Sequence, residues 1–140
     1  MESLSKARDI MNEYVEAITP NESASEAAKR MLEKDIGSIL VVDNGKLVGI
    51  ITKSDYIRAF IKSCRKEDLK VADIMSKPVI TCSPETPISE IIHIMRLNGI
   101  RHIPVLDKNK LLGIVTDFDL ACSATTYISK LLMILRPPKG

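Results

Sequence analysis

Two copies of a short polar motif hold the residues of this chain that are best suited to chemistry. A threonine and an aspartate stand three positions apart at Thr52 and Asp55, and again at Thr116 and Asp119. Each motif lies between a predicted strand and a predicted helix, where free backbone amides attract phosphate. The aspartate can accept hydrogen bonds from the hydroxyls of a ribose. The alternative is that these residues only cap the helix that follows, and capping is compatible with binding.

One position differs in charge between the two halves of the chain, because only the second half has a basic pair there. Arg101 and His102 stand where the first half has Gly37 and Ser38. A guanidinium group pairs well with phosphate oxygens through its planar fork of donors, and His102 can donate one further bond. The alternative is an exposed arginine beside a histidine packed at a strand edge. The pair favours phosphate recognition.

The elements around these residues repeat along the chain. A shift of 64 positions aligns the sequence with itself without a gap. Identical pairs include Asp9 and Asp73, Met11 and Met75, Gly49 and Gly113, Thr52 and Thr116, and Asp55 and Asp119. Such self-similarity at a fixed period is typical of a duplicated structural unit. The chain therefore consists of two copies of one unit.

Each copy predicts the order strand, helix, strand, strand, helix. Ser23 followed by Glu26 has the spacing of a capping box, and Thr86 followed by Pro87 predicts a helix whose first residue is the proline. Turn residues at 43–46 and 107–110 predict two hairpins. The predicted hairpin strands are residues 39–42 with 47–51, and 103–106 with 111–115; a second helix is expected at 54–65 and from 118 onward.

The strands are almost entirely apolar, so both faces of each sheet should be covered. A unit of about 60 residues buries its surface poorly by itself. We therefore expect an α/β fold of two repeats, related by a pseudo-twofold axis, with their sheets packed face to face. The predicted boundaries are repeat 1 at 1–63, a charged linker at 64–70, repeat 2 at 71–124, and a helical extension and tail at 125–140.

The chain resembles the CBS (cystathionine β-synthase) domain family. The resemblance rests on three sequences: Gly49-Ile-Ile-Thr-Lys-Ser-Asp55, Gly113-Ile-Val-Thr-Asp-Phe-Asp119 and Gly99-Ile-Arg-His-Ile-Pro-Val105. The opening Asp-Ile-Met of each copy supports it. The resemblance implies a tandem pair, or Bateman module, in which each repeat is a β-α-β-β-α unit.

The resemblance also implies how a nucleotide is held. The aspartate of each motif would hold the ribose, with the threonine near the phosphate. Basic residues at the position of Arg101 would reach a nucleotide whose ribose is held by the other repeat. We therefore expect Asp55, Arg101 and His102 to form the more phosphate-rich site, which Lys53 strengthens. Asp119 with Ser38 would form a less basic site, where Asp117 repels phosphate.

An apolar wall for the adenine base follows from the resemblance too. Its expected members lie on the segments 18–20, 36–39, 82–84 and 100–104; they are Ile18, Ile36, Cys82, Ile100 and Pro104. Isoleucines at these places belong to the core whether or not a ligand binds.

The expected function is a non-catalytic, regulatory one. The family resemblance implies binding of AMP, ADP, ATP, S-adenosylmethionine or NAD in the cleft between repeats, with Mg²⁺ where the ligand is ATP. The signal would be a change in repeat packing that a regulated protein, unknown from sequence, reads. The alternatives are a structural dimerisation or interaction module without ligand, and a nucleic-acid-binding protein. We expect a homodimer, and the apolar stripe at 128–135 either extends the last helix or serves a partner.

Composition and residue spacing argue against several other classes of protein. The net charge of +2, from 20 basic and 18 acidic residues, argues against a nucleic-acid footprint. Three widely spaced cysteines, Cys64, Cys82 and Cys122, indicate reduced thiols and a cytoplasmic protein without a zinc site. No apolar run reaches the roughly 20 residues that span a bilayer. The two histidines have no metal-ligand or catalytic neighbours at suitable spacing, so we expect no enzyme.

Overall fold

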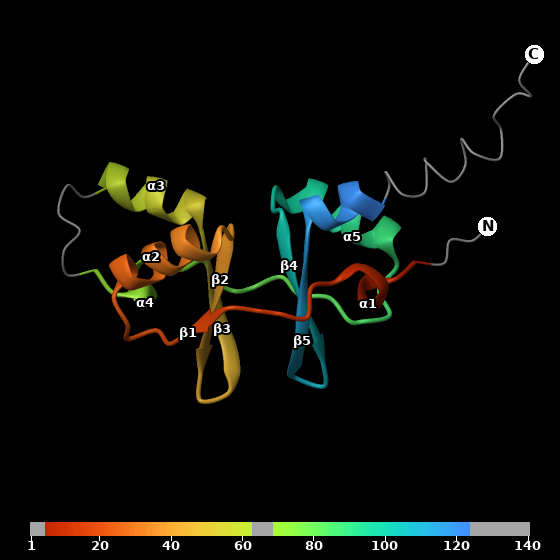
Figure 1. The fold of residues 1–140 in the computed structure, drawn as a ribbon, viewed down its shortest axis with the longest axis horizontal. Coiled ribbons are helices and arrows are strands. Elements are labelled where there is room, and N and C mark those ends of the chain that lie inside the picture. The colour runs from red at the N-terminus through yellow and green to blue at the C-terminus, as the bar shows by residue number, and fades with distance from the viewer. Residues whose placement is uncertain (1–4, 63–68, 124–140) are drawn as a thin grey trace, which may run out of the picture. The chain divides into compact units, whose positions relative to one another are not determined.

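The computed structural model describes residues 5–62 and 69–123 and forms two compact units. The first, here the 14–80 unit, runs from Tyr14 to Ile80. The second combines residues up to Glu13 with those from Thr81 onward and is here the 81–123 unit. The two units are described separately below (Figure 1).

The 14–80 unit contains a three-stranded sheet in the order β1-β2-β3. Strand β1 (Ala17–Ile18) pairs in parallel with β2 (Ser38–Asp43), which pairs antiparallel with β3 (Lys46–Thr52). Its helices are α2 (Ala24–Lys34), α3 (Lys53–Lys62) and α4 (Val71–Ile74). Figure 1 shows the hairpin turn at the end of the strands that points away from these helices. The β3–α3 junction, where the first motif lies, is therefore at the helical end of the sheet.

The 81–123 unit repeats this plan with small changes. Strands β4 (His102–Asp107) and β5 (Lys110–Thr116) form the hairpin, and α1 (Ala7–Ile10) and α5 (Ile88–Asn98) are its helices. Residues 117–123 are helical as well. A single parallel bridge from Cys82 to Val105 stands in place of β1. The mixed α/β fold with two β-α-β-β-α-like repeats is therefore confirmed.

Both hairpins use turns that need left-handed backbone. Asn44 and Gly45 have φ values of 53° and 79°, and Lys108 and Asn109 have 52° and 67°. Two successive residues at positive φ characterise the two-residue turn whose twist suits antiparallel strands. The predicted turns at 43–46 and 107–110 are confirmed, and the strands extend one residue further at each end than their apolar runs.

The short helices α1 and α4 are exchanged between the sequence repeats. In α1, the amide of Ala7 donates to the carbonyl of Thr86 at 2.9 Å; in α4, the amide of Val71 donates to Glu22 at 2.8 Å. Ala7 and Val71 are both fully buried. Each compact unit thus takes its opening helix from the other copy of the sequence. Sequence analysis anticipated neither these helices nor their exchange, and the predicted repeat and linker boundaries stay a prediction.

Each unit has its own apolar core. In the 14–80 unit the core joins strand and helix residues such as Ile39, Val41, Ala27 and Met31. In the 81–123 unit the corresponding residues are Ile103, Val105, Ile91 and Met95. Members of the two cores thus recur at the same offset as the motifs, because the repeated apolar pattern fixes which face of each element is buried.

The helix starts differ from each other. Ser23 caps α2, since its hydroxyl accepts from the amide of Glu26 at 3.0 Å. The prediction that Pro87 is the first residue of α5 is wrong by one position, because Pro87 is the N-cap and Ile88 begins the helix. Thr86 instead accepts a bond from the amide of Ser83.

The predicted linker, Cys64 and the C-terminal stripe at 128–135 lie wholly or mostly outside the described residues.

Candidate functional site

The second motif forms a compact turn at the end of β5. The amide and hydroxyl of Thr116 both donate to Oδ2 of Asp119, at 2.8 and 3.0 Å. The amide of Asp119 in turn donates to the hydroxyl of Thr116 at 3.3 Å. Within the described residues, every hydrogen bond of this carboxylate falls on Oδ2. Asp119 is only partly buried.

The first motif has the same turn but a different second oxygen. Oδ2 of Asp55 accepts from the amide of Thr52 at 2.8 Å and from its hydroxyl at 3.4 Å. Oδ1 accepts from the hydroxyl of Ser76 at 2.6 Å and from the guanidinium of Arg58 at 2.8 Å. Asp55 is 3% exposed. Both oxygens of this carboxylate are therefore engaged by the protein itself.

The basic pair lies at the end of its hairpin where the second motif begins. His102 and Thr116 are direct partners across β4 and β5. The amide of Asp117 donates to the carbonyl of Arg101 at 3.1 Å. Arg101 is exposed and His102 is half-buried. The 81–123 unit thus brings the residues Arg101, His102, Thr116 and Asp117 to one end of its hairpin, where the motif with Asp119 begins.

Ser38 and Lys53 take the corresponding places in the 14–80 unit. Ser38 is the direct partner of Thr52 across β2 and β3, and it is half-buried. Lys53 is exposed at the first position of α3. The hypothesis that joins Asp55 with Arg101, and Asp119 with Ser38, links residues of different units. It remains a prediction.

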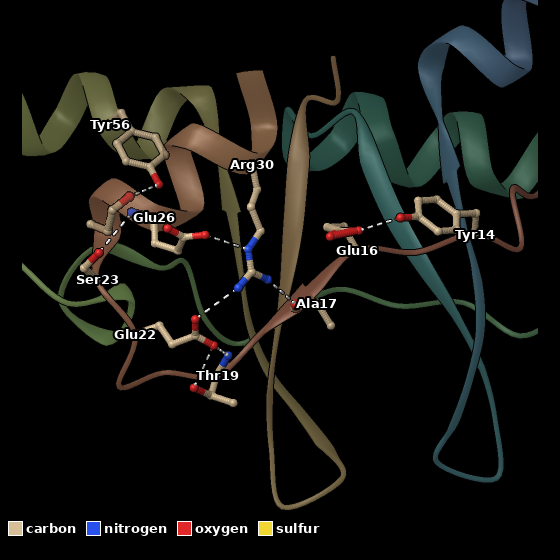
Figure 2. Close-up of polar contacts among 10 residues, drawn as sticks. Tyr14, Glu16, Ala17, Thr19, Glu22, Ser23, Glu26, Arg30 and Tyr56 are labelled. Atoms are coloured by element: carbon tan, nitrogen blue, oxygen red, sulfur yellow. Dashed lines mark hydrogen bonds and ion pairs between the residues drawn. The ribbon is translucent and has the colours of Figure 1, made fainter. Parts of the chain in front are cut away.

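The segment predicted to face a base in the 14–80 unit is held by Arg30, as Figure 2 shows. Its guanidinium donates to the carbonyl of Ala17 at 3.2 Å, to Glu22 at 3.1 Å and to Glu26 at 3.2 Å. Glu22 also accepts from the amide and hydroxyl of Thr19, at 3.4 and 3.3 Å. One side chain of α2 therefore fixes both ends of the segment 17–22. The aligned residue in the other copy is Ile94.

The residues predicted to form the base wall are core residues to different degrees. Ile18, Cys82 and Pro104 are buried, whereas Ile36 and Ile100 are partly buried. Burial raises the pKa of the Cys82 thiol to about 11. A thiol with such a pKa is protonated near neutral pH and is a poor nucleophile. Packing, rather than chemistry, accounts for Cys82.

Three residues that matter to this site were missed in the sequence. Arg58 and Ser76 bind Asp55, and Arg30 braces the segment 17–22. Sequence comparison of the two copies carries a signal, since their counterparts Cys122, Asn12 and Ile94 are residues of different types. Only the fold shows that Ser76, 21 positions away, reaches Asp55.

The described part of the chain has no group of three or more His, Cys, Asp or Glu side chains placed to hold a metal ion. Within residues 5–62 and 69–123, no helix has the length and apolar character needed to cross a bilayer.

Comparison with known proteins identifies the fold family. The CBS domain pattern matches residues 7–62 and 71–123. The CBS domain-containing protein YhcV of Bacillus subtilis is 31% identical over 118 residues, which cover 84% of each chain. Matches to a sulfurtransferase and to an inosine-5'-monophosphate dehydrogenase cover only 23% and 24% of those enzymes. The likeness to enzymes therefore concerns a part of each.

Solved structures agree with this result. The CBS domain structure of NE2398 superposes with a TM-score of 0.83 at 28% identity, covering 86% of this chain and 98% of that one. The CBS domain pair of MJ0100, solved in complex with 5'-methylthioadenosine and S-adenosyl-L-methionine, has a TM-score of 0.81 at 29% identity and covers 89% and 99%. Both repeats carry the pattern, and their elements agree with it. The chain belongs to the CBS domain family and contains a tandem pair of CBS domains.

Proposed function

We propose that this chain is a non-catalytic regulatory module that binds an adenosyl ligand through the motif Thr116–Asp119. The observation that carries the proposal is the contrast between the carboxylates. Among residues 5–62 and 69–123, no hydrogen bond falls on Oδ1 of Asp119, whereas both oxygens of Asp55 accept bonds. A ribose hydroxyl can hydrogen-bond to Asp119 without displacing a protein group. This choice differs from the sequence hypothesis, which made Asp55 the centre of the phosphate-rich site.

The charged residues near the Asp119 motif indicate which ligands would suit it. The exposed guanidinium of Arg101 suits a phosphate or a carboxylate, with His102 as a second donor. Asp117 opposes a high negative charge on the ligand. Ligands of low negative charge therefore fit this site better than ATP; they include AMP, S-adenosylmethionine and 5'-methylthioadenosine. ATP would need Mg²⁺ to offset its charge. That MJ0100, with the same fold, binds two adenosyl compounds supports the class.

The response to ligand is part of the same proposal. Each unit is completed by the opening helix of the other sequence copy, so the repeats are not independent along the chain. We propose that ligand changes the packing of the repeats in a homodimer and that a regulated protein reads this change. The size of the shift is limited by the ligand's difference in affinity for the two arrangements. Neither Cys82 nor Cys122 forms a disulfide within the described residues, which fits a cytoplasmic location.

Thermal unfolding with a panel of ligands tests the proposal. The panel comprises AMP, ADP, ATP with and without Mg²⁺, NAD, S-adenosylmethionine and 5'-methylthioadenosine. A ligand at 100 times its dissociation constant stabilises the folded state by about 2.7 kcal/mol, which raises the melting temperature by several degrees. We expect at least one member to do so. No shift with any member at millimolar concentration would contradict ligand binding and favour a structural assembly module.

A further inference from the structure

We propose that Ser76 and Arg58 close the Asp55 motif to ligand, so that one CBS pair with two intact motifs has a single adenosyl site. The inference rests on the proposed function and adds to it the number of sites and the residues that set this number. Both motifs keep the threonine and the aspartate that would bind. The difference between them lies in two side chains outside the motifs.

The carboxylate of Asp55 has no oxygen left for a ribose. Ser76 and Arg58 both donate to Oδ1, at 2.6 and 2.8 Å, and Thr52 donates twice to Oδ2. With 3% of its surface exposed, Asp55 is also almost out of reach of solvent. A ligand hydroxyl would have to displace the hydroxyl of Ser76 from a buried carboxylate and break the ion pair with Arg58, whose own side chain is exposed. Binding there loses much of the free energy that the same contact gives at an open carboxylate.

Ser76 is held in place by the backbone. Its amide donates to the carbonyl of Ile50 at 2.8 Å, and the amide of Ile50 donates to its carbonyl at 3.1 Å. This pair of bonds fixes the segment after α4 against β3. The hydroxyl of Ser76 is thereby positioned over Oδ1 of Asp55 before any ligand arrives.

The other unit has the same backbone with different side chains. Asn12 pairs with Ile114 in both directions, at 2.9 and 3.0 Å, just as Ser76 pairs with Ile50. The counterpart of Arg58 is Cys122, whose side chain carries no guanidinium. Since the backbones correspond, the two motifs differ in the side chains that these positions present, serine and arginine in one unit and asparagine and cysteine in the other. Ser76 and Arg58 are therefore specificity-determining residues of the pair.

Binding stoichiometry tests this inference directly. Isothermal titration with AMP, and separately with 5'-methylthioadenosine, is carried out on the full chain and on the double variant Ser76→Ala/Arg58→Ala. We expect one equivalent per chain for the wild type and one additional equivalent for the variant. Adding Asp55→Asn to the double variant should remove the additional equivalent. Ser76→Thr, which keeps a hydroxyl, serves as the matched control and should bind as the wild type does.

The outcomes separate this inference from the proposed function. A folded double variant that gains no equivalent overturns the inference, whatever the wild type binds. A wild type with two equivalents, one of them lost in Asp55→Asn, overturns it as well. If the double variant does not fold, Ser76→Ala alone must show the gain as a second, weaker site, and its absence overturns the inference. A wild type without any bound ligand contradicts the proposed function instead.

Discussion

Asp55 and Asp119 occupy equivalent positions in two copies of one motif, yet their surroundings differ. Asp55 is buried and accepts hydrogen bonds from three side chains and a backbone amide. Asp119 is partly exposed and accepts only from Thr116 within the described residues. The same residue is thus enclosed by protein donors in one unit and partly exposed in the other. A duplicated motif does not by itself establish two equal sites.

The largest expected effect is on stability and separates the two aspartates. Asp55→Ala leaves the donors of Thr52, Ser76 and Arg58 without their acceptor, and we expect a loss of about 3 kcal/mol in the free energy of unfolding. Asp119→Ala removes only the interactions with Thr116, with an expected loss of about 1 kcal/mol. Urea unfolding followed by circular dichroism measures both. Equal losses would contradict the comparison.

The next effect concerns the one glycine in each hairpin that another segment of the chain approaches closely. A Cβ on Gly113 would lie 2.7 Å from the carbonyl oxygen of Asn12, whereas a Cβ on Gly49 would meet only the side chain of Met75. A methionine side chain can move, but paired backbone cannot. We expect Gly113→Ala to cost about 2 kcal/mol and Gly49→Ala less. A larger loss of unfolding free energy for Gly49→Ala than for Gly113→Ala in urea unfolding would contradict this expectation.

A smaller effect belongs to the 14–80 unit alone. Arg30→Ala removes three bonds that fix the segment 17–22, and Ile94 gives the other unit no counterpart. Because Arg30 is partly exposed, we expect a loss of about 1 kcal/mol. Lys29→Ala, an exposed neighbour on α2, is the control and should change stability by less than about 0.5 kcal/mol. Similar losses of unfolding free energy for both variants would contradict a stabilising role of Arg30 at the segment 17–22.

The smallest effect is a dependence on alkaline pH. Burial, and secondarily the charge of Asp55, raise the pKa of Tyr56 to about 12, and its hydroxyl donates to the carbonyl of Ala24 at 2.7 Å. The folded state therefore holds this proton more tightly than the unfolded state, whose tyrosine titrates near 10. The resulting stability is complete below pH 10 and is lost as the pH rises towards 12.

Tyr56→Phe isolates this contribution, because the aligned residue of the other unit is Leu120. The variant should lose less stability than the wild type between pH 9.5 and 11.5 in urea unfolding, while Cys82 contributes equally to both. Identical pH profiles would indicate that Tyr56 titrates alike in the folded and unfolded states.

Much of this organisation could be predicted from the chain. The offset of 64 positions, the turn residues and the apolar runs correctly predicted the two repeats and both hairpins, and the motif sequences correctly indicated the family. The exchange of α1 and α4 could not be predicted, since both copies open with the same Asp-Ile-Met and nothing local shows which unit they join. The bond between Ser76 and Asp55 depends on that exchange. The fold shows which side chain reaches each aspartate, and the residue type at that position then distinguishes the two.

Calorimetric titration of two conservative variants with AMP and 5'-methylthioadenosine tests the central claim most directly. Asp119→Asn should weaken binding at least tenfold, because a hydrogen bond to a charged acceptor is lost, while Asp55→Asn should stay within about twofold of the wild type. Both variants must first be shown to be folded under the conditions of the titration. Loss of binding in Asp55→Asn, with wild-type affinity kept in Asp119→Asn, would contradict the account.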